Sequence, residues 1–276
     1  MSQKNRCLSC GNEFDGSYCN HCGEKVIDQK DRRLIHFLGE LFNALTFADS
    51  KVWRSVKSII LYPGRLSHDF IAGKRKPYMK PVALFFLANF IYFLFPIFNT
   101  FNTNLYIQTH QLGFHSELAN RWVQEEVQER QVSYTEYQTL YDAKTTELSK
   151  LLLIAMVFMM ALLFWPIHLG SENSYLFDQV VFSFEFMAFT ILFTVELIGV
   201  LMLITTPFDI EFMKSDMNTS IIMIVLISYF LFRSEQICFG FNRWRSILNT
   251  LLGVGVVGLV LTCYRIMLFF VTFWLV

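Results

Sequence analysis

Five long apolar blocks dominate the pattern of hydrophobic and polar positions along this chain. They are Val82–Phe101, Leu151–Leu169, Leu176–Thr205, Ser220–Phe232, which continues towards Phe239, and Ile247–Val276. A hydrocarbon core about 30 Å thick is crossed by about 20 apolar residues in a helix. The pattern therefore predicts an all-α integral membrane protein with about five transmembrane helices. The fourth block is the weakest, and a re-entrant or sixth segment is an alternative.

The polar segments predict the rest of the organisation. Apolar residues recur at helical spacing over 34–45 and 53–60, which predicts amphipathic helices that lie on the cytoplasmic leaflet or pack as a soluble hairpin against the bundle. Residues 102–150 are too polar to span, and Ser133 and Glu136 have capping-box spacing. We therefore expect an N-terminal head at 1–27, interfacial helices at 28–80, and a bundle at 81–276 with an external helical insertion at about 102–150.

Composition agrees with a membrane protein, and charge gives it an orientation. Hydrophobic residues make up 54% of the 276 residues and charged residues only 17%, which argues against a soluble enzyme and against disorder. Residues 1–80 hold 14 Lys and Arg against 8 Asp and Glu, whereas residues 102–150 hold 4 against 7. Because Lys and Arg are retained on the cytoplasmic side, the N-terminus is expected in the cytoplasm. No signal peptide fits ahead of the first apolar block.

The clearest chemical motif is a pair of Cys-x-x-Cys-Gly turns near the N-terminus, formed by Cys7, Cys10, Cys19 and Cys22. Four thiolates presented from two tight turns suit a tetrahedral, structural Zn²⁺ site, on which so small a fold would depend. Two disulfides or a redox motif are the alternatives, and a reducing cytosol disfavours the first. Residues 1–24 hold only Lys4 and Arg6 as cations, so we expect a protein partner rather than nucleic acid. His21 is expected to be a bystander.

A basic segment directly precedes the first apolar block. Its cations are Lys74, Arg75, Lys76 and Lys80. At the cytoplasmic face they would contact anionic lipid headgroups, at about 1 kcal/mol each. They also suit a topogenic stop, and the two interpretations are compatible. Pro81 is well placed to open the following helix.

Ionisable residues recur within the apolar blocks. Asp178, Glu185 and Glu196 are spaced so that, at 100° per residue, they return to nearly the same helix face. Arg265 in the last block is expected at a similar depth to Glu196, which suggests an ion pair between them. An acidic line facing the bundle interior would be a pathway for protons or a cationic substrate, or simply a set of interhelical contacts. The residues alone favour the second interpretation.

Other polar or small residues in the apolar blocks have ordinary interpretations. His168 is expected to be an end-of-helix residue rather than a ligand, and Cys238 and Cys263 to be buried thiols. Gly253, Gly255 and Gly258 suit close helix packing. No phosphate loop, nucleophile elbow or His-Glu-x-x-His motif is present in the sequence, so no catalytic residue is assigned.

The order of these parts resembles the bacterial zinc-ribbon membrane proteins of domain-of-unknown-function family 3667. The resemblance rests on the four-Cys head, then Tyr62-Pro63-Gly64, then Gly73-Lys74-Arg75 with Tyr78 and Pro81, a span, an insertion, and a late helix after Tyr229. It implies a multi-pass protein of the bacterial inner membrane and carries no known activity. Relatives often have a histidine-rich opening to the third span, and the three histidines are replaced here within Gln179–Met187.

Three functions follow as hypotheses. The first is an assembly or interaction component whose cytosolic zinc ribbon contacts a partner protein; membrane lipids and either a protein partner or a homo-oligomer are the expected partners. The second is a small proton- or cation-linked transporter or channel subunit that uses the Glu185 and Glu196 face. The third, a lipid-modifying enzyme, would need a polar pocket at the interface.

Overall fold

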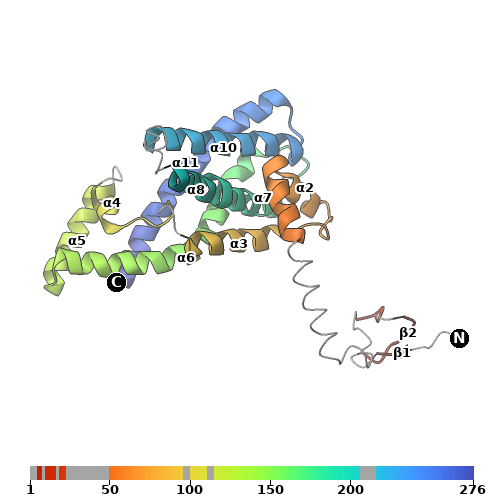
Figure 1. Cartoon of the computed structure of the whole chain (residues 1–276), viewed down its shortest axis with the longest axis horizontal. Helices are drawn as coiled ribbons and strands as arrows, with labels where there is room; N and C mark the ends of the chain where they lie inside the picture. Colours follow the sequence, from red (N-terminus) through yellow and green to blue (C-terminus); the bar gives the residue numbers. More distant parts are fainter. Residues whose placement is uncertain are drawn as a thin grey trace. The chain divides into compact units, whose positions relative to one another are not determined.

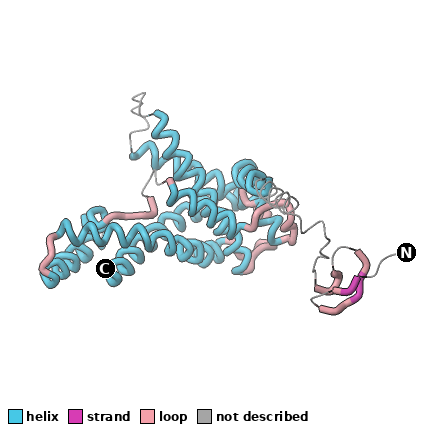
Figure 2. The backbone as a smooth tube through the Cα atoms, turned by 60° about the horizontal axis from the view of Figure 1, so that its bottom comes forward, coloured by secondary structure: helices cyan, strands magenta, loops and turns pink. Residues whose placement is uncertain are grey.

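The computed structural model describes residues 5–7, 10–16, 19–22, 50–95, 100–110, 115–205 and 216–276. Chain contacts divide the molecule into two units, Met1–Lys51 and Val52–Val276, which we describe separately. The amphipathic helix expected over residues 34–45 and the end of the expected head, residues 23–27, lie outside the described residues. Within the described residues, strands occur in the first unit and helices make up most of the second (Figure 2).

The first unit is built on a two-stranded antiparallel hairpin. Strand β1 (Asn5–Arg6) pairs with β2 (Glu13–Phe14), so that Arg6 lies opposite Glu13. The turn that follows β1 is closed by the Cys7 amide, which donates to the Asn12 carbonyl at 2.9 Å, and by the Gly11 amide, which donates to the Cys7 carbonyl at 3.0 Å. Gly11 has φ +73°, a conformation that glycine adopts without strain.

The second unit is a bundle of helices (Figure 1). Residues 52–61 continue a helix that starts at residue 50. The remaining elements are α2 (Arg65–Ile71), α3 (Pro81–Leu94), α4 (Leu105–His110), α5 (Ser116–Arg130), α6 (Tyr134–Ile167), α7 (Leu176–Phe189), η2 (Thr190–Glu196), α8 (Leu197–Thr205), α10 (Asp216–Ile237) and α11 (Arg243–Leu275). Helices α7, η2 and α8 follow one another without a break, and η2 is a π-helical stretch.

Local signals explain several helix ends. Pro81 occupies the first turn of α3, where a missing amide N–H costs nothing. The Glu136 amide donates to Ser133 Oγ at 3.1 Å, which confirms the predicted cap at the start of α6. At α11, Asn242 Oδ1 accepts from the Arg245 amide at 2.9 Å.

Four helices in the described part of the chain are long and apolar enough to cross a membrane. They are Tyr134–Ile167, Leu176–Thr205, Met217–Ile237 and Arg243–Leu275. The expected first span is instead represented by the shorter apolar helix α3. Its 14 residues extend about 21 Å, less than the hydrocarbon thickness of about 30 Å. The prediction of a multi-pass helical protein therefore holds, while the count of five spans does not follow from helix length.

Aromatic side chains fill the centre of the bundle. Helix α7 packs against α3 and α6, and α11 packs against α6 and α10. Phe182 and Phe186 of α7 contact Phe230 of α10, with ring centroids 6.2 and 5.4 Å apart. Gly253 of α11 allows close packing, because an added Cβ would lie 3.0 Å from Leu231. Gly255 and Gly258 have no atom within 4 Å of such a Cβ, so the expected packing role applies only to Gly253.

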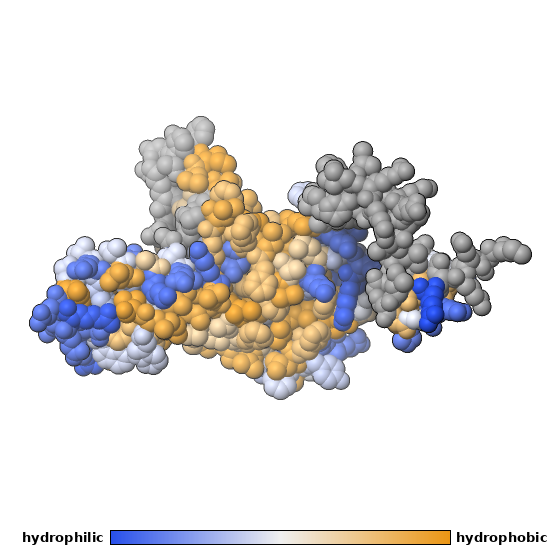
Figure 3. Space-filling view, turned by 90° about the horizontal axis from the view of Figure 1, so that it is seen from below, coloured by the Kyte–Doolittle hydropathy of each residue, from blue (hydrophilic) through white to orange (hydrophobic). Residues whose placement is uncertain are grey.

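A second, smaller core lies among the helices of the insertion. Residues Leu105, Val123 and Tyr141 from α4, α5 and the first part of α6 pack with Phe269 near the end of α11. Helix α6 is continuous through this region into the apolar block, so it is longer than the span expected from hydropathy. Figure 3 shows hydrophilic residues over α4 and α5 at the left and a broad hydrophobic face over the adjoining bundle. Such a face suits contact with lipid.

Candidate functional site

The four N-terminal cysteines form one cluster. Their Sγ atoms all lie within 4.8 Å of one another. The Cys7 and Cys22 sulfurs are 3.4 Å apart, and the Cys10 and Cys19 sulfurs are 3.6 Å apart. None of the four cysteines is joined in a disulfide. Spacing along the sequence therefore predicted their convergence in space.

The geometry of this cluster fits a tetrahedral metal ion. Zinc–thiolate bonds of about 2.3 Å in a tetrahedron place the sulfurs about 3.8 Å apart, which lies within the observed range. Hydrogen bonds from the backbone amides of Cys22 and His21 lower the pKa of the Cys19 thiol to about 6. A thiol with a lowered pKa reaches the thiolate form that a metal requires. His21 is exposed and is not among the four residues of the cluster.

Glu185 anchors the start of helix α2 to the bundle. Its Oε1 accepts from the Gly64 amide at 3.0 Å, and its Oε2 accepts from the Ser67 amide at 2.7 Å and from Ser67 Oγ at 2.5 Å. Glu185 is fully buried. The carboxyl thereby satisfies amide groups that the first turn of a helix leaves without partners. This arrangement matches the interhelical contact expected for Glu185 more closely than a station on a pathway.

The Pro63-Gly64 turn makes this contact possible. Gly64 has φ +82°, and a Cβ added there would lie 2.8 Å from the Cα of Ser234 on α10. Glycine is therefore required both for the backbone conformation and for the close approach to α10. Tyr229 of α10 adds a contact nearby, since its hydroxyl donates to the Ile60 carbonyl at 3.1 Å.

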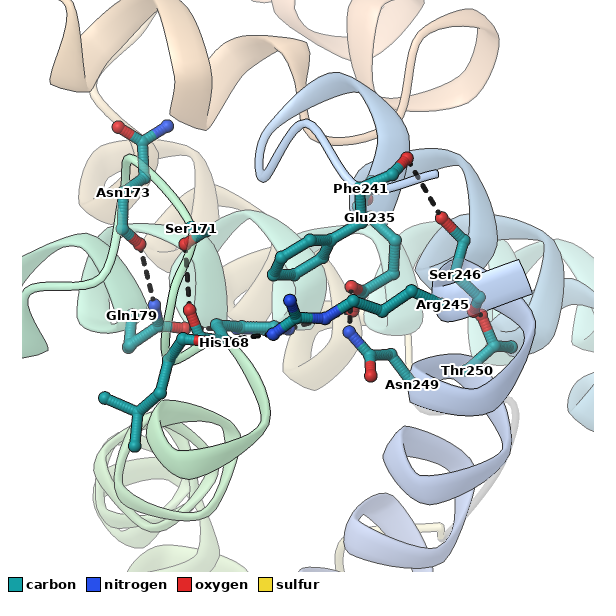
Figure 4. Close-up of polar contacts among 12 residues, drawn as sticks. His168, Ser171, Asn173, Gln179, Glu235, Phe241, Arg245, Ser246, Asn249 and Thr250 are labelled. Carbon is teal, nitrogen blue, oxygen red and sulfur yellow. Dashed lines mark hydrogen bonds and ion pairs between the residues drawn. The ribbon is translucent and has the colours of Figure 1, made fainter. Parts of the chain in front are cut away.

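A second buried polar cluster joins the ends of four helices (Figure 4). His168, at the end of α6, places Nδ1 2.6 Å from Oε1 of Gln179 and Nε2 2.8 Å from Oε1 of Glu235. Asn249 of α11 donates to Glu235 Oε2 at 2.8 Å. The histidine ring also stacks on Phe239, with ring centroids 3.7 Å apart. His168 is an end-of-helix residue, as predicted, and it also joins α7 and α10.

The hydrogen-bond partners determine which atoms of Gln179 and His168 donate and which accept. The Asn173 carbonyl can only accept, so Gln179 Nε2 donates to it at 3.1 Å and Gln179 Oε1 faces His168. His168 Nδ1 must then carry a proton. The 2.8 Å contact between His168 Nε2 and Glu235 Oε1 completes the hydrogen bonding of the ring.

Glu196 has a different environment from Glu185. It lines a groove of about 840 Å³ between α3 and the η2–α8 segment, and its Oε1 has no hydrogen-bond partner among the described residues. The expected single acidic face assumed 100° per residue, whereas the π-helical turns of η2 rotate less per residue. Glu185 and Glu196 therefore meet different neighbours. Asp178 accepts from the Tyr175 amide at 3.1 Å, at the start of α7.

The expected ion pair between Glu196 and Arg265 does not form. No ion pair joins the two among the described residues, and Arg265 instead donates to the Thr100 carbonyl at 3.3 Å. Gln108 donates to the Arg265 carbonyl at 3.1 Å, so the same turn of α11 is held against the insertion. The prediction used only the similar depth of Glu196 and Arg265 along their helices, and this does not show that the two side chains face each other.

The basic segment ahead of α3 is exposed. Lys74, Arg75, Lys76 and Lys80 are all accessible, as contact with headgroups would require. Lys74 also lies 3.7 Å from Asp69, and the Arg75 guanidinium lies 4.7 Å from the centre of the Phe70 ring. Both contacts tie the segment to α2.

Comparison with known proteins identifies a family over part of this region. Residues 49–93 match the family model described as "Protein of unknown function (DUF3667)". The chain resembles this family. The matched segment runs from the helix at 50–61 through α2 into α3, and so contains the Pro63-Gly64 turn and the basic segment, whereas the four cysteines lie outside it. Neither the curated proteins nor the solved structures contain a match.

Two partners in the His168 cluster were not singled out from sequence. Gln179 and Asn249 are polar residues within apolar blocks, and that is the signal that could have identified them. Their pairing is long-range: Asn249 bonds to Glu235 from the next helix, and Glu235 bonds to His168 across 67 positions. Hydropathy identifies such residues as unusual but does not specify their partners.

Proposed function

We propose that this multi-pass membrane protein is an interaction or assembly component of the bacterial inner membrane. Its cytoplasmic N-terminal unit binds one structural Zn²⁺ through Cys7, Cys10, Cys19 and Cys22 and docks a cytosolic partner protein. The helical bundle holds this unit at the membrane, with α3 as a fifth membrane helix. The observation that carries the proposal is the convergence of four thiols, none of them in a disulfide, within 4.8 Å in the first unit.

Charge and chemistry support a protein partner. A site of four thiolates leaves no position for substrate or water, so the metal organises structure rather than catalysis. The sequence of the first 24 residues contains two cations, too few for a phosphate-binding surface. The exposed basic segment at residues 74–80 suits the anionic cytoplasmic leaflet and agrees with an N-terminus on that side.

The test is a comparison of the full chain with its Cys10→Ser variant. Both are expressed at equal levels, extracted in mild detergent and analysed for metal and for stoichiometric co-purifying protein. We expect one zinc per wild-type chain and a partner present in constant ratio, with both lost in the variant while the bundle stays monodisperse. A partner retained equally by the metal-free variant would contradict the docking role. A reporter fused ahead of Cys7 that is active in the periplasm would contradict the orientation.

A second candidate function has one specific observation in its favour. Glu196 lines an open groove, and its Oε1 has no hydrogen-bond partner among the residues that the structure describes, which suits a proton- or cation-linked transporter or channel subunit. Glu185 does not support this function, because both of its oxygens accept hydrogen bonds from α2. Proton or cation flux into liposomes that contain the purified chain, abolished by Glu196→Gln, would favour the second candidate over the first.

A further inference from the structure

The groove between α3 and the η2–α8 segment contains one polar group that its surroundings leave unsatisfied. Glu196 is only 7% exposed, and its Oε1 has no hydrogen-bond partner among the described residues. The other residues that line the groove are apolar, among them Ile91 and Leu94 of α3 and Val200 of α8. A buried carboxyl without a partner is costly in hydrocarbon surroundings. The groove therefore combines an apolar surface with an acceptor that needs a donor.

Contacts within the bundle do not supply that donor. Glu185, on the same continuous helix, has three donors at the start of α2, one from Gly64 and two from Ser67. Arg265, the cation expected beside Glu196, donates instead to the Thr100 carbonyl. None of the residues that the structure describes supplies a charge complement for Glu196, which leaves room for a second molecule in this role. Because the groove opens on an apolar surface, that molecule needs a hydrocarbon part.

The ends of the two helices indicate where such a molecule would lie. Glu196 precedes the end of α8 at Thr205 by nine residues, or about 14 Å. Helix α3 ends at Leu94 after about 21 Å and is shorter than the hydrocarbon core. A short helix is accommodated by local thinning of the bilayer, which moves lipid headgroups inward. The last turn of α3 lines the same groove as Glu196, so an inward headgroup there comes within reach of the carboxylate.

We propose that this groove binds one phospholipid with a primary-ammonium headgroup. The ammonium donates to the carboxylate of Glu196 on the side that lines the groove, and an acyl chain lies along α3 and α8. A primary ammonium supplies three N–H donors and a positive charge, and its bonds to a carboxylate are among the stronger hydrogen bonds in proteins. A choline headgroup has the charge without an N–H donor, and a glycerol headgroup has donors without the positive charge. The proposal is independent of the metal-binding unit and its partner.

The experiment measures which lipid the full chain retains. The protein is reconstituted into nanodiscs that contain equal amounts of phosphatidylethanolamine, phosphatidylcholine and phosphatidylglycerol with identical acyl chains, and native mass spectrometry counts the lipids that remain bound after release. We expect the wild-type chain to retain one phosphatidylethanolamine with at least about tenfold preference over phosphatidylcholine, as one charge-assisted hydrogen bond provides. Glu196→Gln reduces this preference to near unity.

Two further variants keep the test informative. Glu147→Gln removes an exposed carboxylate of α6 and should leave the preference unchanged. Val200→Trp fills the groove from its exposed side without altering Glu196, and should abolish retention even if Glu196→Gln fails to fold. The proposal is overturned if the wild-type chain retains the three lipids equally, if phosphatidylglycerol is preferred, or if the preference survives both groove variants. None of these outcomes depends on zinc.

Discussion

Replacing Gly64 with alanine tests the contact between the Pro63-Gly64 turn and α10. The new Cβ would lie 2.8 Å from the Cα of Ser234 and 3.0 Å from its Cβ. Because the nearest atom belongs to the backbone, a rotamer change cannot relieve the overlap. The Gly64 amide is also one of the donors to Glu185, so any displacement of the turn lengthens that hydrogen bond.

The size of the effect can be separated into two parts. A non-glycine residue at the left-handed φ of +82° costs about 1–2 kcal/mol. Forcing an extra carbon into a packed contact adds about 1–3 kcal/mol. Gly73 provides a matched control, because it has φ +86° and no atom within 4 Å of an added Cβ. Gly73→Ala should therefore show the first cost alone, about 1–2 kcal/mol.

The assay is the thermal unfolding midpoint of the full chain in detergent, followed by fluorescence-detected size exclusion. We expect Gly64→Ala to lower the midpoint clearly more than Gly73→Ala, by about 2–4 °C for each additional kcal/mol. Adding Ser234→Ala should restore little, since the closest atom is the Ser234 Cα. Equal shifts for the two glycine variants would refute the steric explanation, and full rescue by Ser234→Ala would show that the backbone contact had been overestimated.

Three other variants test separate parts of the structure. Cys7→Ser should lower the bound metal from about one ion per chain to near zero by elemental mass spectrometry, whereas Cys238→Ser should not, because Cys238 lies outside the four-thiol cluster. Glu235→Leu should lower the unfolding free energy by about 1–3 kcal/mol for each buried polar group that it leaves without a partner, namely His168 Nε2 and the Asn249 amide; an unchanged midpoint would contradict a structural role for this carboxyl. Gly255→Ala should raise the midpoint slightly through helix propensity, worth about 1 kcal/mol, while Gly253→Ala should gain less because its Cβ meets Leu231 at 3.0 Å. Identical effects of the two alanines would argue against close packing at Gly253.

Features set by local sequence were predictable. The spacing of Cys7, Cys10, Cys19 and Cys22 predicted their cluster because two short turns determine where the thiols point. Hydropathy located the four long apolar helices, and a single serine identified the start of α6. In each case the determining interactions act within a few residues along the chain.

Features set by contacts between distant segments were not predictable. Glu185 was expected to face the bundle, but its donors on α2 lie 118 and 121 positions earlier in the sequence. Glu196 was predicted to lie on the same side of the helix as Glu185. This was wrong because no local signal in the sequence marked the π-helical stretch η2, which changes the rotation per residue. Helix α3 is also shorter than the apolar block that predicted it, since hydropathy does not determine where the backbone hydrogen bonds of a helix end.

The anchoring of α2 by Glu185 has a mechanical consequence. The segment that precedes α3 in sequence donates hydrogen bonds from two of its backbone amides, Gly64 and Ser67, to Glu185 in the middle of α7. Force applied along the chain from residue 52 onwards therefore reaches the interior of the bundle before it reaches the neighbouring helix. The linkage therefore depends on glycine at position 64 on one side and on a single acidic residue, Glu185, on the other.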